Sequence, residues 1–207
     1  MLDEVGRLSA LIGSRICHDL ISPIGAIGNG LELLSMAGVA PGPEVGLLAD
    51  SVAAANARVR FFRIAFGNAE GAPPVAGAEL RDILEGVHAD GRIRVRWRVD
   101  GDVARREARL AFLSILCLEC ALPFGGEIRV HRDADGWHLF TVAERLRVDP
   151  ALWGILRGEA APTPPTAAEV QFPLLRLAIL EGERVTVRDD PERVEIRISP
   201  RAGAADG

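Results

Sequence analysis

The sequence contains no lysine: all 24 of its basic residues are arginine. This absence excludes chemistry that depends on a lysine side chain, such as that of P-loop nucleoside triphosphatases, Schiff-base enzymes and pyridoxal-phosphate enzymes. The chain also has a formal net charge of −5. Domains that bind nucleic acid usually present a basic face, so we expect no nucleic-acid partner.

Cysteine is scarce, with three residues in the chain. The odd number and the lack of a recognisable signal peptide predict a reducing, cytoplasmic location. Cys117 and Cys120 form a CxxC pair inside the apolar run LAFLSILCLECAL. We expect inert core thiols there, because a metal site needs further ligands. Since no apolar run approaches the roughly 20 residues of a transmembrane helix, we also expect a soluble protein without a membrane partner.

Hydrophobic periodicity divides the chain into two halves. Apolar residues recur every three or four positions through residues 3–37, and the glycines and prolines of 37–43 predict a loop. From residue 44 the spacing is that of a heptad seam, formed by Val45, Leu48, Val52, Ala55, Val59, Phe62 and Phe66. Two long helices joined by a loop form an antiparallel hairpin. A lone hairpin buries its apolar stripes poorly, so we expect a homodimer with a four-helix bundle.

The second half has the mixed periods of an α+β domain. We divide the chain into a hairpin (1–70), a linker (71–77), an α+β domain (78–200) and a tail (201–207). The expected helices are 78–88, 103–122, 149–157 and 167–181. The expected strands are 92–99, 127–132, 137–143, 184–188 and 193–198, largely antiparallel.

His18 is the candidate reactive residue of the first helix. With about 100° of rotation per residue, it lies opposite the apolar stripe of that helix. The small and polar residues on its own side are Ser14, Ser22, Gly25, Asn29 and Glu32, with Arg15 nearby. From this pattern alone, two other interpretations stay open: an incidental surface histidine, or a nucleotide loop at GAIGNG. The loop is disfavoured, because such loops follow a strand.

The segment HDLISP (18–23) resembles the H-box of two-component histidine kinases, in which the phospho-accepting histidine lies on the first helix of a dimerising hairpin. The second half resembles a GHKL-type ATP-binding domain. GGEIRV (125–130) is similar to the strand that follows the N-box helix of such a domain, and residues 137–153 are similar to its G1 region. The ATP motifs themselves are missing. No asparagine follows Asn68, AERLR (143–147) replaces the DxGxG motif, and APTPPTAAEVQF (161–172) replaces the glycine-rich G2 segment. The resemblance therefore implies a degenerate domain that does not bind ATP.

An intact H-box segment, SRICHDLISPIGAIGNGLELL (14–34), with a degenerate ATPase-like domain resembles the ChpT family of alphaproteobacterial histidine phosphotransferases. The resemblance implies a homodimeric phosphotransferase of a phosphorelay. It would carry phosphoryl groups from the receiver domain of a hybrid kinase to response regulators such as CtrA and a single-receiver regulator. Two alternatives remain: a non-catalytic pseudokinase dimer that docks receivers, and an unusual active histidine kinase.

The resemblance also implies the roles of the residues around His18. His18 is the expected nucleophile, and Asp19 either fixes its tautomer or is a solvated carboxylate. Arg15 either contacts the phosphoryl group or the receiver, or pairs with Asp19 one turn away. We expect Pro23 to bend the helix. The expected receiver contacts are Ser14, Arg15, Ser22, Gly25, Asn29 and Glu32.

We expect no cofactor or metal in this chain, because the partner receiver supplies the aspartate and its Mg²⁺. The other histidines, His88, His131 and His138, are predicted to be surface or strand residues. His131 and His138 flank a turn, but no third ligand accompanies them.

Overall fold

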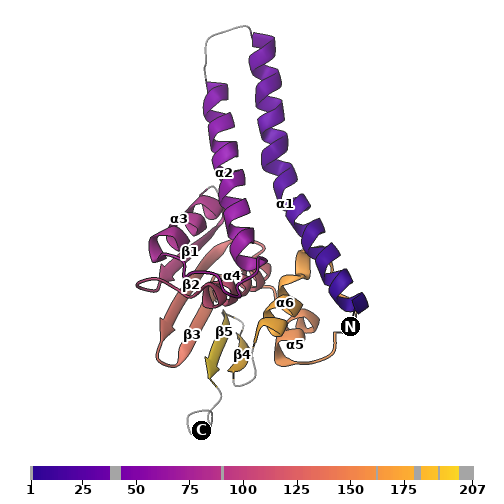
Figure 1. Ribbon diagram of the computed structural model, residues 1–207, viewed down its shortest axis with the longest axis vertical. Helices are drawn as coiled ribbons and strands as arrows, with labels where there is room; N and C mark the ends of the chain where they lie inside the picture. Colours follow the sequence, from indigo (N-terminus) through magenta and orange to yellow (C-terminus); the bar gives the residue numbers. More distant parts are fainter. Residues whose placement is uncertain are drawn as a thin grey trace.

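The computed structural model describes residues 2–37, 43–89, 91–161, 163–179, 183–190 and 192–200. Most of the predicted loop at 37–43 and the whole of the predicted tail at 201–207 lie outside these residues. The chain begins with two long helices, α1 (Leu2–Ala37) and α2 (Pro43–Ala65), which project from the rest of the molecule as a hairpin (Figure 1). Within the described residues, no helix is long and apolar enough to cross a membrane.

The two helices of the hairpin approach closely at Gly30. A Cβ atom at this position would lie 2.7 Å from Cδ2 of Leu48. The predicted heptad seam of α2 is only partly covered, because Val45, Val52 and Val59 are 39%, 44% and 50% exposed. The hairpin therefore leaves an apolar stripe open to solvent.

The second half of the chain forms a five-stranded sheet with the order β1-β2-β3-β5-β4. The strands are β1 (Ile93–Arg98), β2 (Gly126–Asp133), β3 (Gly136–Val142), β4 (Glu183–Asp190) and β5 (Arg193–Pro200). The pairs β2–β3, β3–β5 and β4–β5 are antiparallel, and β1–β2 is parallel. A parallel pair needs a crossover connection, and the helix α4 (Arg105–Cys120) supplies it. The predicted α+β class is thus confirmed.

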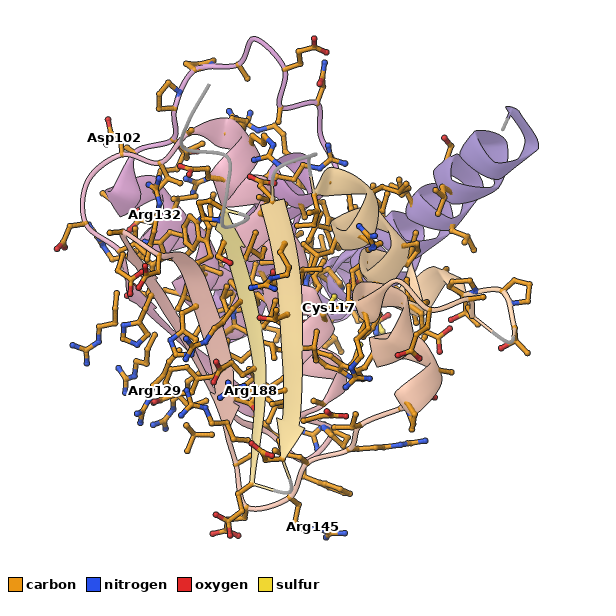
Figure 2. All side chains as sticks on the ribbon, turned by 90° about the horizontal axis from the view of Figure 1, so that it is seen from below. Asp102, Cys117, Arg129, Arg132, Arg145 and Arg188 are labelled. Carbon is orange, nitrogen blue, oxygen red and sulfur yellow. The ribbon has the colours of Figure 1, made fainter. Side chains whose placement is uncertain are left out.

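One face of the sheet is covered by helices and the other is open. The covering helices are α3 (Gly77–His88), α4, α5 (Pro150–Arg157) and α6 (Gln171–Ala178). Figure 2 shows Cys117 of α4 on the helical side and Arg129 of β2 on the opposite side. Arginine recurs at alternate positions of the open face, at Arg94, Arg96, Arg98, Arg129, Arg184, Arg188, Arg193 and Arg197.

The hairpin shares its base with the core of the α+β half. Phe61 of α2 is 1% exposed and its ring lies 4.7 Å from that of Phe112 in α4. On the other helix, Leu8, Leu11, Ile12 and Ile16 pack against the same core. The lower part of α1 is therefore held against the α+β half.

The single helix predicted at 167–181 is wrong. The segment consists of a 3₁₀ turn, η1 (Ala167–Glu169), followed by α6. Thr166 and Glu169 form a capping box around η1. Pro173 in the first turn of α6 has no N–H to donate to the carbonyl of Glu169, so a continuous helix would lose a hydrogen bond there. The chain instead begins a new helix at Gln171.

Candidate phosphotransfer site

His18 lies within α1, as the helical periodicity predicts. The helix continues through Pro23. The side chains of Ser14, His18 and Ser22 lie outside the described part of the structure. The site is therefore built from the residues around them.

Among the expected receiver contacts that the structure describes, Gly25, Asn29 and Glu32 are exposed, whereas the Arg15 side chain is largely buried. The residues on the opposite side of α1, Ile16, Leu20, Pro23, Ile27 and Leu34, are half-buried. A Cβ atom at Gly25 would meet no atom within 4 Å, so no neighbouring group covers the helix surface at this position. The face can therefore accept the surface of another protein.

Arg15 and Asp19 flank His18 in the sequence and pair with each other. Nε of Arg15 donates to Oδ2 of Asp19 at 2.9 Å, and the two side chains are only 15% and 10% exposed. Of the two interpretations left open for Arg15 by the sequence, the structure shows the one-turn ion pair. The carboxylate of Asp19 is thus held beside the turn that carries His18.

The same arginine also reaches the α+β half of the chain. Nη1 of Arg15 donates to the backbone carbonyl of Ala168 at 2.8 Å. That carbonyl accepts a second hydrogen bond, of 2.9 Å, from Nε2 of Gln171, a side chain that is fully buried. Sequence reasoning missed both Ala168 and Gln171. Gln171 carried a usable signal, since it is a polar residue followed by the apolar run FPLL.

The remaining candidate groups are explained by packing. Burial raises the pKa of the Cys117 thiol well above its usual value, and burial together with the charge of Glu119 raises that of Cys120 to about 11. Both thiols therefore stay protonated at neutral pH. His131 and His138 face each other on β2 and β3, and His138 contacts Glu195. Among the described residues, no group of three His, Cys, Asp or Glu side chains could hold a metal ion.

The segment that resembles the G1 region and the segment that replaces G2 take part in the apolar core. Trp153 of α5 and Phe172 of α6 are 1% and 0% exposed, with their ring centroids 5.4 Å apart. In α4, residues 110–118 are buried throughout. These segments thus pack against each other through hydrophobic side chains.

The helical hairpin with its H-box and the α+β half together define a histidine phosphotransferase. Residues 77–193 match the family model described as "Histidine phosphotransferase C-terminal domain", and the chain belongs to this family. It is 33% identical to protein phosphotransferase ChpT of Brucella abortus (strain 2308) over 196 residues, which cover 90% of this chain and 92% of that protein. A solved bacterial phosphotransferase is 29% identical, with a TM-score of 0.75 over 93% of this chain and 96% of that one.

Proposed function

We propose that this chain carries phosphoryl groups on His18 between the aspartates of receiver domains in a two-component phosphorelay. The main support is the place of His18 in the H-box segment on α1, in a chain similar to ChpT over nine-tenths of its length. The exposed Gly25, Asn29 and Glu32 on the same helix give a receiver domain room to dock.

The chain contributes one covalent bond to this reaction, between His18 and the phosphoryl group. A ring nitrogen of neutral His18 attacks the phosphorus of the donor receiver's aspartyl phosphate in line with the leaving carboxylate oxygen. The P–N bond forms as the P–O bond breaks, and the aspartate leaves as a carboxylate. The reverse displacement passes the group to the acceptor aspartate. Mg²⁺ belongs to the receivers, and Asp19 supports the imidazole by accepting a hydrogen bond from its other nitrogen.

We also propose that two copies of the chain form a dimeric four-helix bundle through the hairpin. The support is the concentration of exposed apolar side chains on these two helices: Ile24, Leu33, Met36, Val45, Leu47, Val52 and Val59. Exposed apolar side chains gathered on one part of a molecule are typical of an association surface. In the bundle the stripes of four helices would cover one another.

In this proposal the α+β half binds no nucleotide. The support is the absence of an asparagine after Asn68 and the apolar packing of Trp153 against Phe172, which belong to the segments at the G1 and G2 positions. Calorimetric titration with Mg-ATP should therefore show no binding heat. Binding together with autophosphorylation would identify an active kinase instead.

The test of the phosphotransfer itself is transfer from a receiver domain that carries a radiolabelled phosphoryl group. Wild-type protein should become labelled, and His18→Gln should not, while its circular dichroism spectrum stays unchanged. His131→Gln, which alters an imidazole on the open sheet face, serves as the matched control and should be labelled normally. A stable complex that never contains phosphohistidine would instead identify a non-catalytic docking protein.

A further inference from the structure

The carbonyl of Ala168 joins the two halves of the molecule. It accepts hydrogen bonds from Arg15 in α1, at 2.8 Å, and from Gln171 in α6, at 2.9 Å. Arg15 and Ala168 are 153 residues apart in the sequence. In Figure 1 the lower part of α1 passes beside α6. One backbone oxygen of the α+β half thus contacts the helix that carries His18.

The Ala168 carbonyl is held firmly from its own side. Gln171 is fully buried. Its Nε2 donates to the Ala168 carbonyl and also lies 3.1 Å from Sγ of Cys120 in α4. The turn that contains Ala168 is closed by Thr166, whose backbone N–H and hydroxyl both donate to Glu169 at 2.8 Å. Ala168 therefore belongs to an ordered turn that is anchored to the core.

On the hairpin side, the same guanidinium holds Asp19. Because Arg15 donates through Nε to Asp19 and through Nη1 to Ala168, its planar group fixes the distance between the two acceptors. Water screens the Arg15–Asp19 pair only weakly, since both side chains are largely buried, whereas the hydrogen bond from Arg15 to the Ala168 carbonyl is exposed. His18 lies between these two residues on the same helical turn. This contact therefore adds to the apolar packing of α1, which includes Ile16, in orienting that turn relative to the α+β half.

We propose that Gln171 and the Ala168 carbonyl, acting through Arg15, position Asp19 and His18 for phosphoryl transfer. The inference rests on the proposed function of His18. Arg15 and Gln171 are positioning residues here, because each acts through Asp19. In-line transfer depends on the placement of the nucleophile, and small displacements are costly to the rate. The degenerate domain thus has a role in the reaction without touching the reacting atoms.

Two variants remove this positioning while keeping the fold. Arg15→Lys keeps the positive charge near Asp19, but a single ammonium does not reproduce the planar fork that spans both acceptors. Gln171→Met has a similar volume and removes the amide donors. Oε1 of Gln171 is a buried atom without a hydrogen-bond partner in the described structure, so losing the amide should cost little stability. Arg176→Lys, at an exposed position of α6, is the matched control.

The measurement is single-turnover transfer from a phosphorylated receiver, over a range of receiver concentrations. We expect Arg15→Lys and Gln171→Met each to slow transfer at saturating receiver about 10-fold, with little change in the receiver concentration for half-maximal rate. The double variant should be no slower than the slower single variant, because both changes break one chain of contacts. Arg176→Lys should behave as wild type.

A second readout monitors the helix directly. Hydrogen exchange of the backbone amides of residues 15–22 should be faster in Arg15→Lys and Gln171→Met, with α4 unchanged. Wild-type transfer rates in both variants, with wild-type protein that is labelled, would overturn the positioning role alone. A wild-type protein that accepts no label would overturn the proposed function and this inference together.

Discussion

His88 and Glu119 join α3 to α4 through a hydrogen bond of 2.8 Å between Nε2 and the carboxylate. The other ring nitrogen, Nδ1, lies 2.7 Å from the carbonyl oxygen of Leu84. Both partners are acceptors, so both nitrogens donate only when the imidazole is protonated. Burial opposes this charge, but the hydrogen bond and negative charge of Glu119 outweigh it, and the pKa of His88 is raised above its ordinary value. Protonated His88 and Glu119 thus form an ion pair between α3 and α4.

This ion pair predicts that the free energy of unfolding depends on pH. A group whose pKa is raised by folding stabilises the native state fully below its unfolded pKa, about 6.5 for histidine. This contribution is lost as the pH rises through the folded-state pKa. Urea unfolding should therefore show wild type exceeding His88→Gln by about 1–2 kcal/mol near pH 6 and by less near pH 8. A difference that is constant with pH would contradict a protonated His88.

Gly30 predicts an unusual response to alanine. Alanine in place of glycine normally stabilises a helix by up to about 1 kcal/mol. At Gly30 the new methyl group would press on Leu48, so Gly30→Ala should be destabilising, by about 1–3 kcal/mol. Gly28→Ala, whose Cβ meets no atom within 4 Å, should show the normal gain in thermal unfolding. Adding Leu48→Ala to Gly30→Ala should recover part of the loss, and failure to do so would argue against this contact.

If the exposed valines of α2 form the dimer interface, charged substitutions there should change the oligomeric state. Val52→Glu combined with Val59→Glu would place two carboxylates in the middle of the proposed four-helix bundle, where burying unpaired charge is costly. This variant should sediment as a monomer in analytical ultracentrifugation, while wild type sediments as a dimer. Val142→Glu, at a valine of β3 that is similarly exposed, should remain dimeric. A wild-type monomer at micromolar concentration would refute the bundle.

The core thiols predict slow alkylation. Because burial raises the pKa of Cys117 well above its usual value and that of Cys120 to about 11, few thiolates exist at neutral pH. In a Cys17→Ser variant, native protein should react with iodoacetamide at least about 100-fold more slowly than protein unfolded in urea. Rapid modification of the folded variant would show that the pair is reactive after all.

The sequence allowed a good prediction of the elements and a poorer prediction of what connects them. Helical periodicity placed α1, α2, α3 and α4 within a few residues, and alternation placed the five strands. The break before α6 was missed, although Pro173 marks it. Nothing in the sequence indicated the contact between Arg15 and Ala168. Its acceptor is a backbone carbonyl, which every residue type provides. Contacts of this kind follow only from the way distant elements pack.

The arginines on the outer strands have a consequence for the behaviour of the protein in concentrated solution. β1 and β4 are the two edges of the sheet, and their unpaired backbone groups could accept a strand from another molecule. Arg94, Arg96 and Arg98 line one edge, and Arg184 and Arg188 the other. A second copy that approached the β1 edge with its own β1 would bring like charges together. Strand addition between two such edges is thereby opposed, which leaves the exposed apolar side chains of the hairpin as the surface for the proposed dimer.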